Sequence, residues 1–372
     1  MGYVRSRLRP IKTKNRTVAL VIGLLVLFVA IMTVWVSPVT WTMVSQATSD
    51  EGVVSDQQDA EVKQYRAAAQ RGSVEAMLKL VDCYEFGRGV EKDISKAAKW
   101  CREAAEKGDA GAMFHLVELC GNGMSGEMDM REAVGWWRKA ASKGVPEAMY
   151  NLGVSYKDGV VVGRDMHEAV KWWRKAAEKW FYGAMKNLAV CYATGEGVEK
   201  DMCEALKWWR RLAELGDEEA MYNIGLCYKN GEGVEHDSGE AAKWYRKAAE
   251  RGSADAMCNL GVLYNDGDGL EKDVNEAMEW LRKAAEKGNV KAMSNLGLCY
   301  YRGRSVEDAI ESARWFRKAA ESGDADSMYY LGLFYDYGIG VAKDAQESAR
   351  WYRKAADRGC EKAVKALKEK VM

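Results

Sequence analysis

Residues Ala256 to Gly288 read A-M-C-N-L-G-V-L-Y-N-D-G-D-G-L-E-K-D-V-N-E-A-M-E-W-L-R-K-A-A-E-K-G, and this pattern returns about every 36 residues along the chain. A tryptophan marks the second half of every copy, at Trp100, Trp136, Trp172, Trp208, Trp244, Trp280, Trp315 and Trp351. A fixed period of this length is typical of stacked repeat proteins, because one short unit cannot bury its own apolar face. The sequence therefore predicts one repeat array in place of ordinary globular domains.

Each unit is predicted to form two helices. In one copy Ala220, Ile224 and Tyr228 are spaced i, i+4 and i+8, which gives a first helix with one apolar face. A Gly-x-Gly turn follows, and Asp237 then stands where the N-cap of a second helix is expected. A glycine inside the first helix, such as Gly225, is expected to allow the backbones of neighbouring helices to approach closely.

The patterns A-M-x-N-L-G-x-x-Y-x-x-G-x-G-V-x-K-D and A-x-x-W-x-R-K-A-A-E-x-G resemble the Sel-1-like repeat, a relative of the tetratricopeptide repeat. The resemblance covers about residues 59–359. It implies an all-α, right-handed α/α solenoid whose concave face is lined mainly by the first helices. It also implies an adaptor that assembles protein complexes. A cysteine-rich branch of the family is linked to penicillin binding and β-lactam hydrolysis.

The expected organisation has six parts. They are a basic cytosolic tail (1–17), a transmembrane signal-anchor helix (18–36), a tether (37–55), an N-terminal half-repeat that acts as a cap (56–72), eight repeats (73–359) and a C-terminal capping helix (360–372).

The segment from Val18 to Val36 carries no charge, and a helix of its length matches the thickness of a bilayer core. Six basic residues precede it, and no Lys or Arg follows it until Lys63. The positive-inside rule therefore predicts a single-pass membrane protein with a cytosolic N-terminus and extracytoplasmic repeats. A cleaved signal peptide is the alternative, which would release a secreted scaffold.

Charge and motifs argue against several classes of function. Apart from the six basic residues before the anchor, 49 basic residues stand against 55 acidic ones, which does not suit nucleic-acid binding. The sequence contains no S-x-x-K, K-T-G, H-E-x-x-H, G-x-x-x-x-G-K or G-x-S-x-G motif. We therefore expect no enzyme activity, no cofactor, no metal and no small-molecule substrate. The alternative is the β-lactam chemistry of the cysteine-rich branch, although this chain lacks the cysteine spacing of that branch.

The histidines and cysteines give little indication of a metal site or a catalytic role. His115 and the two other histidines occupy different positions of the repeat, so they do not form an evident ligand set. Four of the nine cysteines share one position of the first helix, where a small buried side chain is expected. Cys191 and Cys203 flank one turn, and a disulfide between them remains an alternative.

One asparagine in each of five units is the most suggestive polar feature. These residues are Asn151, Asn187, Asn223, Asn259 and Asn295. The amides are candidates to hold the backbone of an extended peptide on the concave face, and a structural bond to the neighbouring unit is the alternative. The position before them varies, which is typical of specificity, and its candidate protein-binding residues are Tyr150, Lys186, Tyr222 and Tyr329.

Aromatic residues break the repeat pattern at one junction. Trp180, Phe181 and Tyr182 stand where other units have a glycine followed by small or polar residues. They form either an exposed aromatic patch for a partner or a locally overpacked junction. The sequence thus predicts a membrane-anchored scaffold that binds proteins or extended peptides.

Overall fold

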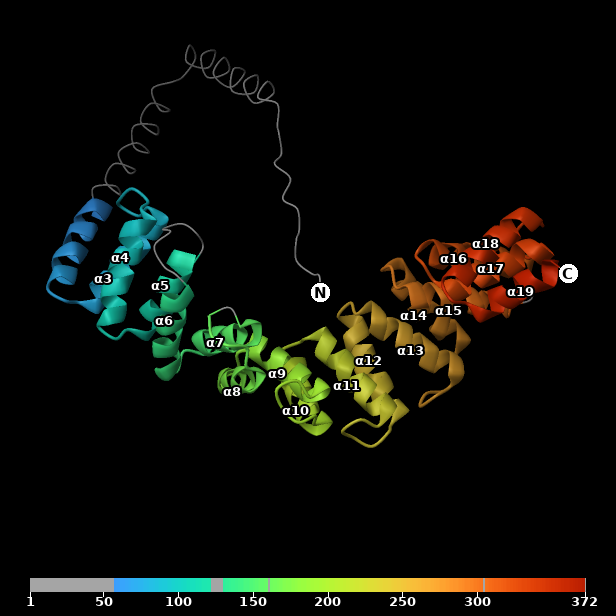
Figure 1. Cartoon of the computed structure of the whole chain (residues 1–372), viewed down its shortest axis with the longest axis horizontal. Coiled ribbons are helices and arrows are strands. Elements are labelled where there is room, and N and C mark those ends of the chain that lie inside the picture. Colours follow the sequence, from blue (N-terminus) through green and yellow to red (C-terminus); the bar gives the residue numbers. More distant parts are fainter. Residues whose placement is uncertain (1–56, 122–129, 160, 304, 372) are drawn as a thin grey trace, which may run out of the picture. The chain divides into compact units, whose positions relative to one another are not determined.

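The computed structural model describes residues 57–121, 130–159, 161–303 and 305–371, and within these ranges the chain contains helices and turns but no strand. A helix covers residues 57–70. The later helices (Figure 1) are α3 (Val74–Phe86), α4 (Ile94–Glu106), α5 (Ala110–Gly121), α6 (Met130–Ser142), α7 (Pro146–Asp158), α8 (Met166–Ala177), α9 (Tyr182–Thr194), α10 (Met202–Glu214), α11 (Glu218–Asn230), α12 (Ser238–Glu250), α13 (Ala254–Asp266), α14 (Val274–Glu286), α15 (Val290–Tyr301), α16 (Val306–Glu321), α17 (Ala325–Tyr337), α18 (Ala345–Asp357) and α19 (Glu361–Val371).

The chain divides into two compact units, Met1–Met128 and Asp129–Met372. Within each unit, helices that follow one another in the sequence pack side by side. The odd-numbered helices from α3 to α17 are the first helices of the repeats, and the even-numbered ones from α4 to α18 are the second helices. This alternation is the predicted order of helix, turn, helix, turn.

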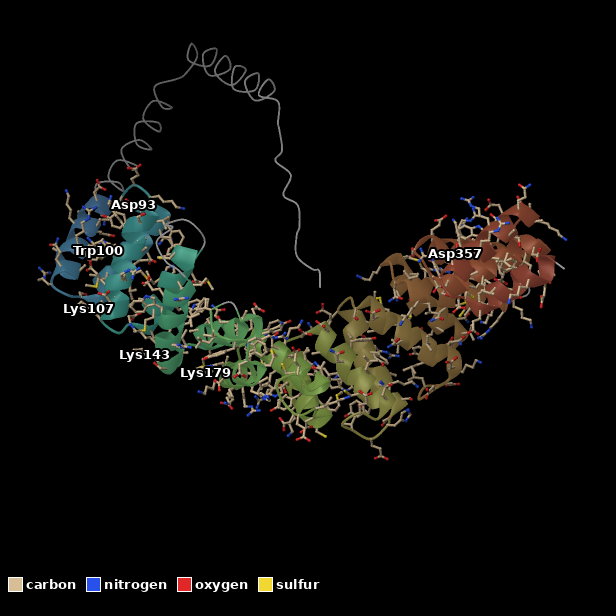
Figure 2. All side chains as sticks on the ribbon, viewed as in Figure 1. Asp93, Trp100, Lys107, Lys143, Lys179 and Asp357 are labelled. Atoms are coloured by element: carbon tan, nitrogen blue, oxygen red, sulfur yellow. The ribbon has the colours of Figure 1, made fainter. Side chains whose placement is uncertain are left out.

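The second helices begin at the predicted aspartates. Asp237 has extended backbone angles, and its carboxylate accepts a hydrogen bond from the backbone N–H of Glu240 at 2.9 Å. Such a cap contributes about 1 kcal/mol, because it satisfies a backbone donor that the helix cannot satisfy itself. Asp93 caps α4 in the same way, and Figure 2 shows it at the opposite end of that helix from Lys107. The same cap occurs at Asp165, Asp201, Asp273 and Asp344.

The turn between the two helices of a unit fixes its position on the preceding unit. Gly231 ends α11 with a φ of 71°, and its N–H bonds back to the carbonyl of Cys227. A Cβ atom on Gly233 would lie 2.7 Å from the carbonyl carbon of Met202, at the start of the preceding second helix. Only glycine fits this contact, so the Gly-x-Gly turn also sets the register between units.

The glycines inside the first helices have a different role from the one expected. A Cβ atom on Gly225 would lie 2.5 Å from the ring of Tyr245, and one on Gly153 would lie 2.3 Å from the indole of Trp173. These rings belong to the second helix of the same unit and are almost fully buried. The glycine therefore makes room for a large side chain, and the expected close approach of two backbones is not its main reason.

The repeated tryptophans pack against the array. Trp136, Trp208, Trp315 and Trp351 are buried, and the other four are half-buried. A cation three residues later in the helix lies over the ring in seven units, as Lys247 does over Trp244 at 4.1 Å from the ring centre. The other pairs are Lys139 with Trp136, Lys175 with Trp172, Arg211 with Trp208, Lys283 with Trp280, Lys318 with Trp315 and Lys354 with Trp351.

The predicted membrane segment cannot be compared with the structure. Residues 18–36 lie outside the described residues, as do the basic tail and most of the tether. Among the described helices, none is both long enough and apolar enough to cross a bilayer.

Candidate protein-binding surface

The structure places the predicted protein-binding residues on one set of helices. We call these residues the first-helix face, and they are Tyr150 and Asn151 on α7, Lys186 and Asn187 on α9, Tyr222 and Asn223 on α11, Asn259 on α13, Asn295 on α15 and Tyr329 on α17. All of them are half-buried. A half-buried side chain has one side packed on its neighbours and one side available to a partner.

Three hollows occur on the first helices at the same position of the repeat. One of about 170 Å³ lies along α13 and α15 and is lined by residues that include Asn295, Leu298 and Cys299. The residues 180 positions earlier, His115, Glu118 and Leu119, line a hollow of about 250 Å³. Those another 36 positions earlier, Lys79, Asp82 and Cys83, line a hollow of about 200 Å³. This position of the repeat is an asparagine, Asn295, in the first hollow, and it is His115 and Lys79 in the other two.

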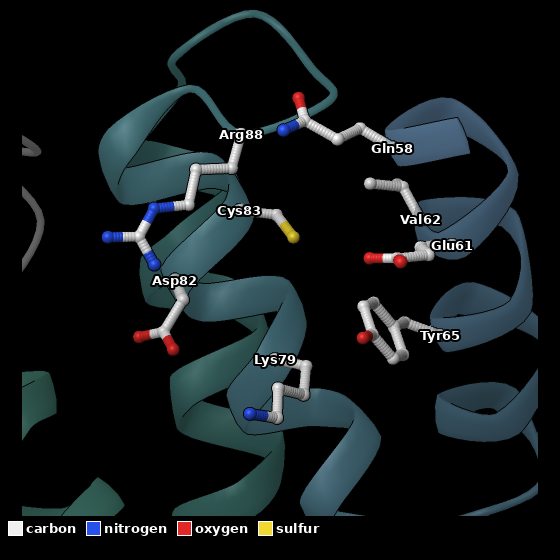
Figure 3. A pocket seen from close by; sticks show the side chains of 8 residues that line it. All are labelled: Gln58, Glu61, Val62, Tyr65, Lys79, Asp82, Cys83 and Arg88. Atoms are coloured by element: carbon white, nitrogen blue, oxygen red, sulfur yellow. The ribbon is translucent and has the colours of Figure 1, made fainter. Parts of the chain in front are cut away.

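Figure 3 shows the most N-terminal of these hollows. Gln58, Glu61, Val62 and Tyr65 of the helix over 57–70 form one wall, and Lys79, Asp82 and Cys83 of α3 form the other, with Arg88 from the turn beyond α3. Cys83 directs its sulfur into the space between the walls. Burial raises the pKa of the Cys83 thiol, so this thiol is a neutral, weakly reactive group.

The middle hollow contains a histidine paired with a carboxylate. His115 Nε2 lies 3.1 Å from Glu85 Oε2, and Phe86 at the rim is mostly exposed. Within the part of the chain that the structure describes, no three His, Cys, Asp or Glu side chains are grouped so as to hold a metal ion. This hollow thus combines a histidine–carboxylate pair with an apolar rim.

Two of the asparagines contact the preceding unit. Asn295 Nδ2 lies 3.8 Å from the Cys258 sulfur, which is within the range of a weak hydrogen bond. Burial raises the pKa of Tyr222, and the side chain of Asn259 opposes this rise. The asparagine of one unit therefore lies beside the variable position of the unit before it.

The variable positions pack towards the following unit. The ring centre of Tyr150 lies 5.1 Å from that of Phe181 in the following unit, and Lys362 Nζ of α19 lies 6.0 Å from the ring centre of Tyr329. Lys186 forms a 2.6 Å ion pair with Glu219. These contacts hold the aromatic and basic side chains of the first-helix face in fixed positions, which lowers the entropy cost of binding a partner.

The aromatic residues at the irregular junction differ in exposure. Trp180 is 51 % exposed and Tyr182 is 47 % exposed, whereas Phe181 is half-buried against Tyr150. The Tyr182 hydroxyl donates a hydrogen bond to the buried carboxylate of Asp217. This bond is the largest cause of the raised pKa of Tyr182.

A bond that the sequence did not predict joins successive units. Arg174 Nη2 on α8 donates to the hydroxyl of Tyr192 on α9, at 2.6 Å. The same bond, always 18 residues apart, joins Arg66 to Tyr84, Arg138 to Tyr156, Arg210 to Tyr228, Arg246 to Tyr264, Arg282 to Tyr300 and Arg317 to Tyr335. Both residues belong to the repeat pattern, so their constant spacing was the signal that could have revealed it.

The cysteines are separate thiols. All nine are free, and seven are buried, so the alternative of a disulfide between Cys191 and Cys203 is not what the structure shows. Burial raises the pKa of Cys191 to about 11. Cys203 is the exposed member, and its sulfur lies 3.3 Å from the carbonyl oxygen of Gly233.

Comparison with known proteins identifies the repeat. A family model described as the Sel1 repeat matches residues 74–109, 111–145, 146–179, 183–217, 218–253, 254–289, 290–324 and 325–360. These eight matches coincide with the helix pairs from α3–α4 to α17–α18. No protein with a curated description matches the sequence.

Two solved structures are similar over most of the array. A protective antigen of uropathogenic Escherichia coli strains, described as displaying an SLR fold, is 35% identical with a TM-score of 0.71, and the match covers 82% of this chain and 66% of that one. A Sel1 repeat protein from Oxalobacter formigenes is 31% identical with a TM-score of 0.65, and the match covers 82% and 89%. This chain thus spans just under two thirds of the first relative's length. The chain belongs to the Sel1-repeat proteins, whose helical solenoid is a protein-interaction fold and is generally not catalytic.

Proposed function

We propose that the chain is a scaffold that binds partner proteins or extended peptides on its first-helix face. The observation that carries this proposal is the recurrence of a hollow at one position of the first helices, lined there by Lys79, His115 or Asn295, with volumes of about 170 to 250 Å³. Each hollow has room for about one side chain of a partner. A segment lying across α3 and α5 would therefore insert side chains into the hollows of successive repeats.

The polar groups of the face suit the backbone of such a segment. An amide side chain can donate and accept hydrogen bonds at once, as a peptide group requires. Asn187, Asn223 and Asn259 occupy successive units on α9, α11 and α13. The half-buried Tyr150, Tyr222 and Tyr329 would add apolar contact with few rotatable bonds.

The test changes Asn187, Asn223 and Asn259 together to Ala in the full chain. The control changes Lys243 and Arg350 to Ala, because these exposed residues lie on the second helices and form ion pairs with Glu240 and Glu347 of their own helix. Captured proteins are quantified by mass spectrometry, and the melting temperature of each variant is measured. The proposal expects the triple variant to lose a partner that the control retains, with a similar melting temperature.

Two results would count against this function. If the triple variant captures the same proteins in the same amounts, the asparagines do not hold a partner. If it melts far below the control, the amides are structural bonds between units, as the contact of Asn295 with Cys258 already is.

We further propose that residues 18–36 anchor the scaffold in a membrane, with the repeats on the extracytoplasmic side. The support is the uncharged run itself and the basic residues confined to its N-terminal flank. Sequencing the N-terminus of the mature protein tests this. A mature chain that begins after Thr42 and leaves the membrane fraction would instead be a secreted scaffold.

A further inference from the structure

The repeat brings a basic side chain over the glycine that ends the preceding unit. A Cβ atom on Gly72 would lie 3.3 Å from Lys107 Nζ, and one on Gly144 would lie 3.5 Å from Lys179 Nζ. Figure 2 labels both of these lysines. The same pairing, 35 residues apart, joins Gly216 to Arg251, Gly252 to Lys287 and Gly323 to Arg358. Arg251 and Arg358 also donate to the carbonyl of their glycine, at 3.4 and 3.3 Å.

At one junction both members of this pair are replaced by apolar residues. Trp180 stands in place of the glycine, and Leu215, again 35 residues later, stands in place of the basic residue. The repeat register therefore brings these two side chains to the same place. Trp180 is 51 % exposed and Leu215 is 54 % exposed, so the replacement puts apolar surface on the outside of the array.

Trp180 has a backbone conformation that is unfavourable for a tryptophan. Its φ of 64° makes it the one residue other than glycine with positive φ among the residues that the structure describes. In this region a Cβ atom crowds the following carbonyl, which is unfavourable for a tryptophan. Because the ring is about half exposed, its burial does not offset the backbone strain. A strained, exposed aromatic residue of this kind indicates a functional role.

A third change at this junction supplies a charge. Arg211 stands where six other units have a lysine, and its guanidinium lies 5.6 Å from the centre of the Trp180 ring and 4.7 Å from that of Trp208. Arg211 makes no ion pair with any described residue. A guanidinium stacked on indoles keeps its N–H fork free for a carboxylate, which a lysine cannot bind in two places.

Tyr182 follows Trp180 by two residues and is fixed in place. It is 47 % exposed, and its hydroxyl is held by the carboxylate of Asp217, which is buried. Lys186 lies near both groups but is neutralised by Glu219 and Asp217. Arg211 therefore places a positive charge beside the ring of Trp180, whereas Arg251, next to Leu215, donates to the carbonyl of Gly216.

We propose that Trp180, Tyr182, Arg211 and Leu215, the Trp180 site, dock a protein segment that presents an apolar side chain next to a carboxylate. The apolar side chain would cover Trp180 and Leu215, and the carboxylate would pair with Arg211. This proposal rests on the proposed scaffold function, and it adds a second contact region outside the first-helix face.

The test uses the full chain and a phage-displayed library of random peptides. Peptides enriched on the chain are synthesised, labelled, and measured by fluorescence anisotropy against three chains: unchanged, W180G/L215K and R211K. All three substitutions restore residues found in the other units, so the variants are expected to fold. The proposal expects an enriched class with an aromatic or aliphatic residue beside Asp or Glu, which binds W180G/L215K at least about tenfold more weakly. R211K, or the Asn or Gln version of the peptide, is expected to weaken binding several-fold.

Several outcomes would overturn the Trp180 site. One is a set of enriched peptides that bind W180G/L215K as tightly as the unchanged chain. If those peptides no longer bind the variant with Asn187, Asn223 and Asn259 changed to Ala, the proposed scaffold function is supported, and the Trp180 site alone is wrong. If sedimentation shows that the unchanged chain self-associates and W180G/L215K does not, the occupant is a second copy and the peptide assignment is wrong.

Discussion

Arg174 on α8 and Tyr192 on α9 share a 2.6 Å hydrogen bond that crosses from one repeat to the next. The Tyr192 ring is buried, and the guanidinium lies 5.9 Å from its centre. The bond therefore has a charged donor and an acceptor that is shielded from water, which makes it stronger than a bond between two neutral exposed groups.

Tyr192→Phe removes the acceptor and keeps the ring. We expect a loss of about 1 to 2 kcal/mol in the free energy of unfolding, measured by urea denaturation. Tyr228→Phe is the matched control, because its bond to Arg210 is longer, at 3.0 Å, and exposed. A larger loss for Tyr228→Phe than for Tyr192→Phe would contradict the role assigned to burial.

Gly225→Ala tests the room that the helix glycine makes for Tyr245. The added Cβ would lie 2.5 Å from the ring, so we expect a loss of about 1 to 3 kcal/mol despite the better helix propensity of alanine. Gly135→Ala on α6 is the control, because a Cβ there meets nothing within 4 Å. That variant is expected to gain up to about 1 kcal/mol. Equal effects of the two changes, measured by urea denaturation, would show that the ring contact is unimportant.

Trp180→Gly tests whether Trp180 is strained. Removing the Cβ from a residue with φ of 64° is expected to raise the free energy of unfolding by about 1 kcal/mol, even after the contact with Arg211 is lost. Gly288→Ala is the opposite change at φ 88°, where a Cβ meets nothing within 4 Å. It is expected to lose about 1 kcal/mol from backbone strain alone. Calorimetric melting of both variants measures whether each change raises or lowers the free energy of unfolding. A destabilised Trp180→Gly chain would show that Trp180 is a packing residue.

The exposures of the thiols predict their reactivity. Cys203 is exposed, whereas Cys101, Cys191, Cys227 and Cys258 are buried, and burial raises the pKa of Cys101 to about 12 and those of the other three to about 11. A protonated, buried thiol reacts slowly. Titration with a chromogenic disulfide reagent at pH 8 should therefore show one fast thiol in the folded protein. The denatured protein should show nine, and a count of seven there would indicate a disulfide.

Much of the fold could be predicted from the sequence because the repeat multiplies each local signal. Asp237 and its equivalents cap helices through their own nearest neighbours, so a local pattern was enough to predict them. The family prediction of Sel1 repeats is confirmed by eight matches. Residues 18–36 remain a prediction, because they lie outside the described residues.

The sequence was less informative about residues whose main contacts are with another helix. Gly225 was assigned to a close approach of backbones, but its position is set by the ring of Tyr245 on α12. The bond from Arg174 to Tyr192 was missed because its two residues lie on helices of different units, and the tyrosine position was already explained by the apolar face of its own helix. The pairing of Trp180 with Leu215 likewise emerged only when the structure showed which side chain covers each terminal glycine.

We expect the first-helix face to receive the partner, and not the exposed side of the second helices outside the Trp180 site. Site-specific photocrosslinking in the full chain measures this, with a photoreactive phenylalanine placed at Tyr222 or Tyr329 on the first-helix face, and at Lys243 on α12 or Arg350 on α18. Protein adducts are expected from the first two positions and none from the other two. Adducts that form only from the second-helix positions would contradict this expectation.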